Sequence, residues 1–337
     1  MMLAALPALA ATPTTAQSGQ AFSNPVWEHD FPDPTVWQGD DGVWRAAATG
    51  CRILVSTNLI DWRPSGRRLF DDEHFGKLSA EWRGLWAPCV TRLDPKGPYL
   101  LYLTLFNGPD NSRIAVYTSA SPDGPFGDGA ILTSSKATGI IDTIDPFVLR
   151  DPDGGKVWLF FGSCGKVHRV QLADDGRSLA PDAQYVHVAG LSIGESPNRD
   201  KVYEGTYLFR RNGWWYLFAS RGHYNIGDYA VVVGRSRTLE GTFLGRDGRP
   251  LTEGGATTIL SSKQGDRLYG PGHNGEIFST PSGRTYMFYH CHDAKFPKKN
   301  PESRYNPRPL FLQEVLWDDE GWPCFKDGRP AESEVLR

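Results

Sequence analysis

The sequence lacks a strong charge of either sign, because 36 basic and 39 acidic residues leave a formal net charge of −3. Proteins that bind the phosphates of a nucleic acid usually carry a basic face. We therefore expect no nucleic-acid partner and a substrate that is neutral. The sequence also lacks an internal run of about eighteen apolar residues, so we expect no membrane-spanning helix.

The cysteines are few and form no CxxC pair, which gives no support to a zinc knuckle or a redox motif. Because cysteine prefers protein interiors, we expect buried free thiols. The five positions are Cys51, Cys89, Cys164, Cys291 and Cys324.

No long segment repeats apolar residues at helical spacing, so helices should be few. Aromatic residues make up 12% of the chain, which also contains 37 glycines and 25 prolines. Aromatic runs between many turn formers are typical of short strands. An all-β protein is therefore predicted.

The N-terminal end is apolar from Leu3 to Ala11, and Ala8-Leu9-Ala10 fits a small-residue cleavage site. A positively charged start is missing, since the first basic residue is Arg45. We predict a signal peptide within residues 1–20 and a secreted or periplasmic protein. Residues 21–337 are expected to form a single domain.

Five segments share one pattern: a small or polar pair, a short apolar strand, a turn with glycine and a second, aromatic strand. Their starts lie 54 to 70 residues apart, which leaves room for two more strands in each unit. Four strands per unit, repeated radially, predict a five-bladed β-propeller with four-stranded antiparallel blades around a central channel. A β-sandwich is the alternative. The tail LFLQEVLWDDEGWPCF adds a hairpin to the last blade. The five segments begin at Asp33, Ala87, Asp145, Glu204 and Asn274.

Three of these five aligned starts are carboxylic acids: Asp33, Asp145 and Glu204. Equivalent positions on innermost strands surround the propeller axis, and crowded carboxylates raise one another's pKa values. Such a ring is a candidate functional site. Glycoside hydrolysis needs two carboxyl groups in different protonation states, and a third can adjust the acid. A cage for a hard cation is the main alternative use.

From about Asp30 to Phe325, the chain resembles glycoside hydrolase family 43, and within it the 1,5-α-L-arabinanases and arabinofuranosidases. The resemblance is carried by ordered motifs: FPDPTV, LWAPCV, RIAVYTSASPDGPF, IDPFVLRDPDGG, LFFGS, YEGTYLFRRNGWWYLFAS, YGPGHN and YHCHD. It implies Asp33 as the general base that activates water, Glu204 as the general acid, and Asp145 as the residue that adjusts and orients that acid. It also implies inversion at the anomeric carbon, and no organic cofactor.

The resemblance assigns further positions to substrate. Trp86 is expected to be a sugar platform, with core packing as the alternative. Phe106 and Asn107 are expected at the cleft rim, and Ser163 and Arg308 are expected to reach the active site. A plain loop role is the alternative for Phe106, Asn107 and Arg308.

His273 stands one residue before the fifth aligned position. Relatives hold a calcium ion with waters beside such a histidine, so the resemblance implies a channel Ca²⁺ at His273. A histidine hydrogen-bonded without metal is the alternative.

The substrate is predicted to be plant cell-wall polysaccharide, with α-1,5-arabinan as the leading candidate and the enzyme acting as a monomer. Cys89, Thr206 and Gly275 depart from residues common in the family, and they leave the exact linkage open. The alternatives are an exo-acting α-L-arabinofuranosidase or β-xylosidase, and a carbohydrate-binding propeller without catalysis.

Overall fold

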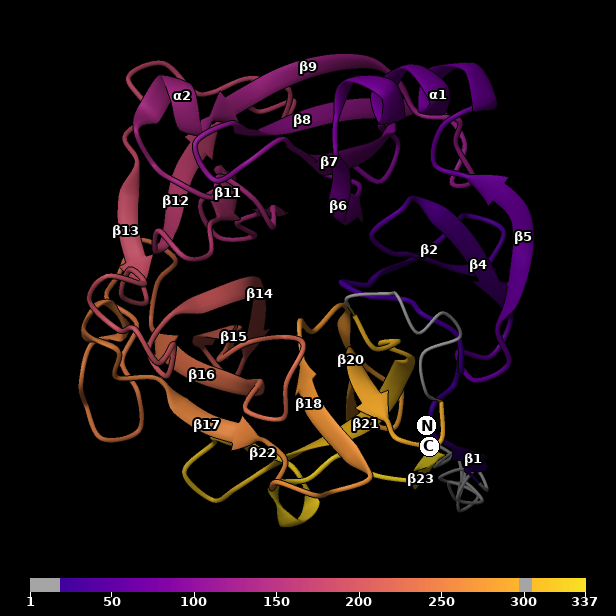
Figure 1. The fold of residues 1–337 in the computed structure, drawn as a ribbon, viewed down its shortest axis with the longest axis vertical. Coiled ribbons are helices and arrows are strands. Elements are labelled where there is room, and N and C mark those ends of the chain that lie inside the picture. Colours follow the sequence, from indigo (N-terminus) through magenta and orange to yellow (C-terminus); the bar gives the residue numbers. More distant parts are fainter. Residues whose placement is uncertain (1–18, 297–304) are drawn as a thin grey trace, which may run out of the picture.

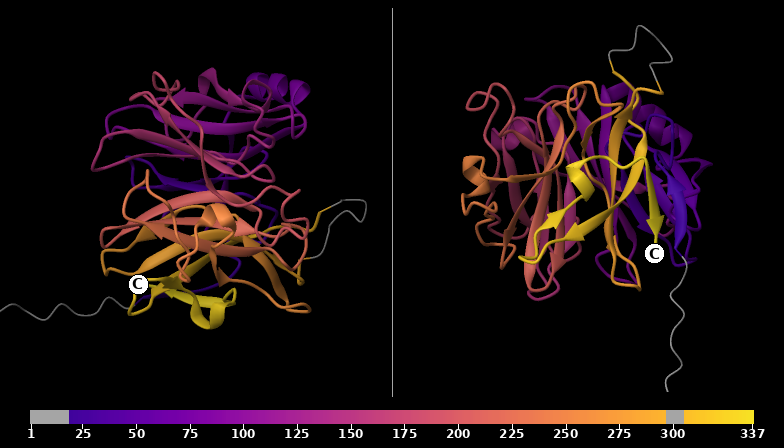
Figure 2. Two further views of the ribbon diagram at one scale, coloured as in Figure 1. Left: turned by 90° about the vertical axis from the view of Figure 1, so that its left-hand side faces the viewer. Right: turned by 90° about the horizontal axis from the view of Figure 1, so that it is seen from below.

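The computed structural model describes residues 19–296 and 305–337, which form five sheets arranged in a ring (Figure 1). In side view the strands run roughly along the axis of the ring (Figure 2). The predicted five-bladed β-propeller is therefore confirmed.

Each of the first four blades has four antiparallel strands in chain order. Blade one contains β2 (Thr35–Gln38), β3 (Trp44–Ala47), β4 (Arg52–Ser56) and β5 (Arg63–Arg68). Blade two contains β6 (Gly84–Thr91), β7 (Tyr99–Phe106), β8 (Ser112–Ser119) and β9 (Gly127–Ser134). Blade three contains β10 (Phe147–Arg150), β11 (Val157–Phe161), β12 (Val167–Leu172) and β13 (Val186–Ala189). Blade four contains β14 (Tyr203–Arg211), β15 (Trp214–Arg221), β16 (Ala230–Ser236) and β17 (Thr257–Leu260).

Blade five has its innermost strand in two pieces, because β18 and β19 both pair with β20. The expected tail hairpin, β21 with β22, completes this blade. Its strands are β18 (Leu268–Gly272), β19 (Ile277–Ser279), β20 (Thr285–Asp293), β21 (Leu310–Trp317) and β22 (Pro323–Cys324).

The turns between the first and second strands follow the sequence pattern. In four blades the turn glycine has a positive φ, a conformation that side chains disfavour. These glycines are Gly42, Gly155, Gly213 and Gly283. The sequence repeat and the structural repeat therefore share their most constrained residue.

Five clusters of buried apolar side chains hold the ring together, one at each contact between neighbouring blades. Between blades one and two, for example, Trp37 packs with Leu85 and Leu101. Between blades five and one, Val36 packs with Phe288. Because each sheet is covered on both faces, the aromatic second strands are almost fully buried.

The two ends of the described chain meet. Strand β1 (Gln20–Ser23) pairs with β23 (Ser333–Leu336), and Gln20 lies opposite Leu336. Strands β1 and β23 accordingly lie side by side in Figure 1. The sequence did not predict this pairing, and Gln20 falls at the end of the expected signal peptide, whose residues 1–18 lie outside the described part.

Helices are few, as predicted. Helix α1 (Asp72–Glu81) connects blades one and two, and the Asp71 side chain caps it by accepting the His74 N–H. Helix α2 (Ser135–Thr138) follows β9, and two short 3₁₀ turns cover Leu251–Glu253 and Lys326–Gly328. None of the helices in the described ranges is long and apolar enough to cross a membrane. All five cysteines are free, and three of them are buried.

Candidate active site

The innermost strands are all interrupted at one level of the channel. Strands β2 and β10 begin two residues after Asp33 and Asp145, respectively. In β6 and β14 the pairing register shifts between Trp86 and Cys89 and after Glu204. Blade five is broken between β18 and β19. Each interruption turns side chains of the inner strand toward the axis.

One residue per blade adopts the left-handed conformation at this level. These residues are Asp33 (φ 58°), Ala87 (44°), Asp145 (58°), Gly205 (61°) and His273 (44°). The backbone therefore corrects the sequence alignment of the blades. In blade four the equivalent of Asp33 is Gly205, one residue after Glu204, and in blade five it is His273, one residue before Asn274. The three acids share a level of the channel, but Glu204 occupies a neighbouring position in its strand.

The strained residues are tied to the preceding blade. In four of the five blades, the N–H of this residue is accepted by a hydroxyl or imidazole near the end of the second strand of the preceding blade. The hydrogen bond offsets a conformational cost of roughly 1–3 kcal/mol. The four bonds run from Asp33 N to His290 Nδ1 (3.2 Å), Ala87 N to Thr49 Oγ1 (3.0 Å), Asp145 N to Thr104 Oγ1 (3.0 Å) and His273 N to Ser220 Oγ (2.7 Å). The fifth such hydroxyl, on Ser163, donates to Glu204 instead.

Asp33 is held as a carboxylate. Its Oδ1 lies 3.0 Å from Arg308 Nη1 and 3.3 Å from His273 Nδ1, and its Oδ2 accepts the Thr49 hydroxyl at 2.7 Å. Burial alone raises the pKa of Asp33, but Arg308, His273 and the Thr49 hydroxyl outweigh it and leave the pKa below its usual value. Arg308, which was predicted to reach the active site, thus lies against Asp33.

Asp145 has the opposite electrostatic environment. Its side chain is buried, and burial together with the nearby negative charges of Glu204 and Asp33 raises the pKa of Asp145 well above its usual value. The Gly205 N–H bonds to this carboxyl group and opposes the shift only in part. The electrostatic environment of Asp145 therefore opposes its ionisation, whereas that of Asp33 favours it.

Glu204 is fixed by two hydroxyl groups. Ser163 Oγ lies 2.6 Å from its Oε2, and the Tyr229 hydroxyl lies 2.6 Å from its Oε1. Because hydroxyl groups both donate and accept, they hold Glu204 in one orientation with or without its proton. Ser163 was predicted to reach the substrate, but in the described structure its hydroxyl is directed to Glu204.

The remaining predicted residues lie on blade two. The rings of Trp86 and Phe106 are stacked with centroids 4.0 Å apart and planes at 22°. Both are half-buried, at the level of the channel where Ala87 turns inward. The Asn107 side chain instead binds backbone, because it accepts the Arg83 N–H and donates to the Glu81 carbonyl. Asn107 therefore orders the loop after α1.

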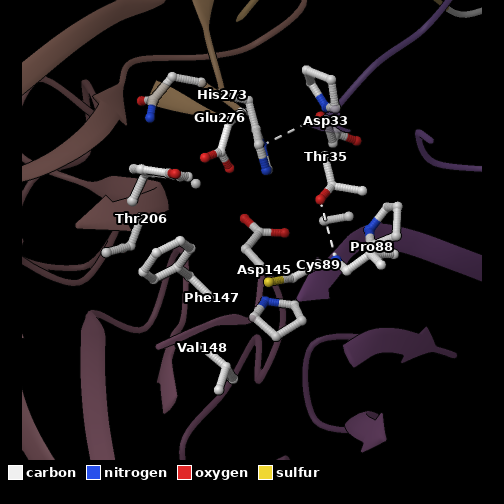
Figure 3. A pocket seen from close by; sticks show the side chains of 18 of the residues that line it. Asp33, Thr35, Pro88, Cys89, Asp145, Phe147, Val148, Thr206, His273 and Glu276 are labelled. Atoms are coloured by element: carbon white, nitrogen blue, oxygen red, sulfur yellow. Dashed lines mark hydrogen bonds and ion pairs between the residues drawn. The ribbon is translucent and has the colours of Figure 1, made fainter. Parts of the chain in front are cut away.

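A cavity of about 250 Å³ occupies the channel beside the carboxylates. Figure 3 shows the side chain of Asp145 pointing into it from blade three, and those of Glu276 and His273 from blade five. Buried polar atoms without a hydrogen-bond partner also line this cavity, namely Thr206 Oγ1 and both side-chain atoms of Asn274. In the described ranges, no three His, Cys, Asp or Glu side chains are grouped as metal ligands.

Sequence reasoning missed Thr49, Tyr229, His290 and Glu276. A signal for two of them was present, because AAAT, YLTL, FFGS, FAS and FYH end the second strands of the five repeats with a hydroxyl or an imidazole. Tyr229 and Glu276 have no such equivalent in the other repeats. Burial raises the pKa of Glu276 to about 7.

The sequence model of glycosyl hydrolases family 43 matches residues 22–323. The chain is 30% identical to the extracellular exo-α-(1→5)-L-arabinofuranosidase ArbA of Cellvibrio japonicus, over 87% of this chain and 86% of that protein. It is 31% identical to arabinan endo-1,5-α-L-arabinosidase C of Emericella nidulans, over 90% and 93%.

A solved structure with a similar fold is the α-L-arabinanase of Cellvibrio cellulosa in complex with arabinohexaose. Its TM-score is 0.74 at 26% identity, and the superposition covers 89% of this chain and 96% of that one.

Proposed function

Because this chain belongs to glycosyl hydrolase family 43, we propose that it hydrolyses α-1,5-linked L-arabinofuranosyl bonds of arabinan with inversion. The observation that carries the proposal is the contrast between two acids in one channel. Arg308, His273 and Thr49 contact Asp33 and keep its pKa below the usual value, whereas burial and the neighbouring negative charges raise the pKa of Asp145. The arabinan-acting relatives support the substrate.

Asp33 serves as the general base. A group that accepts a proton from water must be ionised at the working pH, and Arg308 and His273 keep Asp33 in that state. Thr49 and Arg308 contact different oxygens of the carboxylate, and together they orient Asp33 toward the attacking water. Asp33 acts through water rather than as a nucleophile, which inverts the anomeric carbon.

Glu204 serves as the general acid. It delivers a proton to the leaving oxygen, while Ser163 and Tyr229 keep its carboxyl group in place. After cleavage Glu204 takes up a proton from solvent before the next turnover.

The Trp86–Phe106 stack serves as the apolar platform for a sugar ring. Its two rings brace each other, so the platform is rigid before substrate binds. Preorganised aromatic surface of this kind contributes to binding at a small entropic cost.

We also propose that the channel cavity holds a hydrated Ca²⁺ beside His273. Hard cations prefer oxygen ligands, and the cavity offers the Glu276 carboxylate and the unpartnered oxygens of Thr206 and Asn274. His273 Nδ1 is directed at Asp33, which leaves Nε2 for the ion. Since no group of three His, Cys, Asp or Glu side chains lies together in the described part of the chain, waters would complete the shell. A bound ion would supply positive charge to the site.

Secretion and a monomeric state belong to the same proposal. An extracellular relative and the apolar start of the chain support export. Gel filtration with light scattering measures the mass of the particle, and the mass of one chain is expected, which is 37.4 kDa before any signal peptide is removed.

A sugar-release assay on linear α-1,5-arabinan, arabinoxylan and xylan tests the proposal. We expect release from linear arabinan, and loss of release in Asp33→Ala. Monomer alone from the first minutes indicates exo action, whereas a ladder of oligosaccharides indicates endo action. Release from xylan without release from arabinan would replace the arabinan assignment with a xylosidase one.

A further inference from the structure

A groove of about 1540 Å³ runs over blade one, and its wall includes Thr49, the residue that donates to Asp33. Arg52, which follows Thr49 by three positions in the sequence, lines the same groove. A chain of that length spans at most roughly 11 Å, so the groove begins at the active site and continues outward over β4 and β5.

The groove contains an uncompensated pair of positive charges. Arg52 and Arg68 lie directly opposite each other in the β4–β5 ladder. Arg67, which immediately precedes Arg68 in β5, also lines the groove. None of the three forms an ion pair with a carboxylate within residues 19–296 and 305–337. Like charges placed opposite each other on neighbouring strands are destabilising. Such an arrangement is relieved by an anion that bridges the two guanidinium groups.

One of these guanidinium groups is already positioned. The Arg68 guanidinium lies 4.2 Å from the centre of the Phe75 ring, a cation–π contact that limits its rotamers. A positioned guanidinium loses less entropy when it binds a carboxylate.

Of the acidic residues that line the groove, Asp123 forms an ion pair with Arg45, whereas Asp71 and Asp30 accept backbone N–H groups and keep their negative charges. Together with Glu28 and Asp72, these acids balance the three arginines and Lys295 over the groove as a whole. The uncompensated positive charge is therefore local to Arg52 and Arg68, because no groove acid forms an ion pair with either guanidinium in the described ranges.

We propose that this groove binds the carboxylate of a uronic acid residue in the polysaccharide, bridged by Arg52 and Arg68. This inference rests on the proposed function, because it extends the same substrate outward from the cleavage site. The enzyme then favours arabinan attached to an acidic backbone over free neutral arabinan. The net charge of the chain led us to expect an entirely neutral substrate. Under this proposal, only the part of the substrate at the cleaved bond is neutral.

The test compares one polymer in two forms, a galacturonate-bearing arabinan and the same material after chemical reduction of its carboxyl groups. At 20 mM salt we expect the KM of the wild-type enzyme to be about fivefold lower on the acidic form, the scale of an exposed ion pair. The difference should disappear at 300 mM salt, because exposed charges are screened. It should also disappear in Arg52→Glu and Arg68→Glu.

Arg63→Glu is the matched control. Arg63 lies on the same strand, is exposed and unpaired in the described ranges, and does not line the groove. The Arg63→Glu variant should keep the lower KM on the acidic form of the polymer. Equal KM values on both forms in the wild type, or the same loss in Arg63→Glu, would overturn the proposal.

Linear neutral arabinan distinguishes the proposed hydrolysis from the proposed uronate site. Its hydrolysis depends on the catalytic carboxyl groups and not on the groove. If no variant or wild-type protein cleaves it, the proposed function fails. Calorimetric titration with trigalacturonate then tests the groove by itself, with binding expected in the wild type and in Arg63→Glu but weakened in Arg52→Glu. Absence of binding to the wild type would reject the groove site.

Discussion

The Tyr229 hydroxyl donates to Oε1 of Glu204 at 2.6 Å, while the Tyr229 ring stacks on His290 with the two planes 8° apart. His290 Nδ1 in turn accepts the N–H of Asp33. One buried tyrosine thus connects the proposed acid to the backbone of the proposed base. Orientation of the two carboxyl groups is therefore a shared property of blades one, four and five.

Tyr229→Phe should keep the ring stack and remove one of the two hydroxyls that hold Glu204. Because a hydrogen bond to a charged group contributes about 1.5–3 kcal/mol, we expect kcat on arabinan to fall about tenfold to a hundredfold. Tyr102→Phe is the control, since that hydroxyl is also buried but donates to the Gly176 carbonyl. An unchanged kcat in Tyr229→Phe would remove Tyr229 from the mechanism.

Arg308 should set the acid limb of the pH profile. Removing its charge in Arg308→Gln raises the pKa of Asp33, so the base becomes protonated at a higher pH. The acid limb of kcat/KM is then expected to shift toward neutral pH, whereas Arg308→Lys keeps the charge and most of the original position. A limb that stays in place in Arg308→Gln would mean that Asp33 is not the group titrating there.

Glu204→Gln should discriminate between leaving groups. Cleavage of arabinan needs a proton on the leaving oxygen, and loss of that proton should reduce kcat by about 10²- to 10⁴-fold. A nitrophenyl arabinofuranoside has a stable leaving group and should lose far less. Glu240→Gln, which alters an exposed ion pair with Lys156, is the control. Equal losses on both substrates would contradict the assignment of Glu204 as the acid.

Thr104 should stabilise the strained backbone at Asp145. Its buried hydroxyl accepts the Asp145 N–H, so Thr104→Val leaves that donor without a partner at a cost of about 1–3 kcal/mol. Thr104→Ser keeps the hydroxyl and should retain most of the stability. Urea unfolding of both variants measures the difference. A Val variant as stable as the wild type would show that this anchor is dispensable.

Calcium should stabilise the folded enzyme. At a free concentration one hundred times Kd, a ligand that binds only the folded state adds about 3 kcal/mol to the free energy of unfolding. We expect a chelator to lower Tm and Glu276→Gln to abolish the effect of added calcium. Elemental analysis of active, dialysed protein provides the check, and a calcium-free active enzyme would rule out the ion.

The blade count and the nature of the site could be predicted because both are local and repeated. A turn such as Asn212-Gly213 fixes its own hairpin, and five copies of the hairpin determine the ring. The three acids stand at the start of repeats, so their convergence on the channel followed from the alignment. The motif around Arg308 led to the prediction that this residue reaches the site, and the structure places it 3.0 Å from Asp33.

The remaining features depend on long-range structure. The backbone irregularity after Glu204 offsets this acid from Asp145 by one position in the aligned strands. This offset cannot be recognised from the repeated sequence pattern. The pairing of β1 with β23 joins residues more than 300 positions apart. Tyr229 enters the site from a third strand, which no repeat marks as functional. Each of these contacts is set by ring closure rather than by local sequence.

The central claim is that Asp33 activates water for a direct displacement, with Glu204 protonating the leaving oxygen. Proton NMR of an α-1,5-linked arabino-oligosaccharide during the first minutes of hydrolysis tests it most directly, because it identifies the anomer released before mutarotation. The β anomer should appear first with the wild-type enzyme, and Asp33→Ala should release none. If the α anomer appears first, a covalent intermediate has formed, and the assignment of Asp33 as a base acting through water is contradicted.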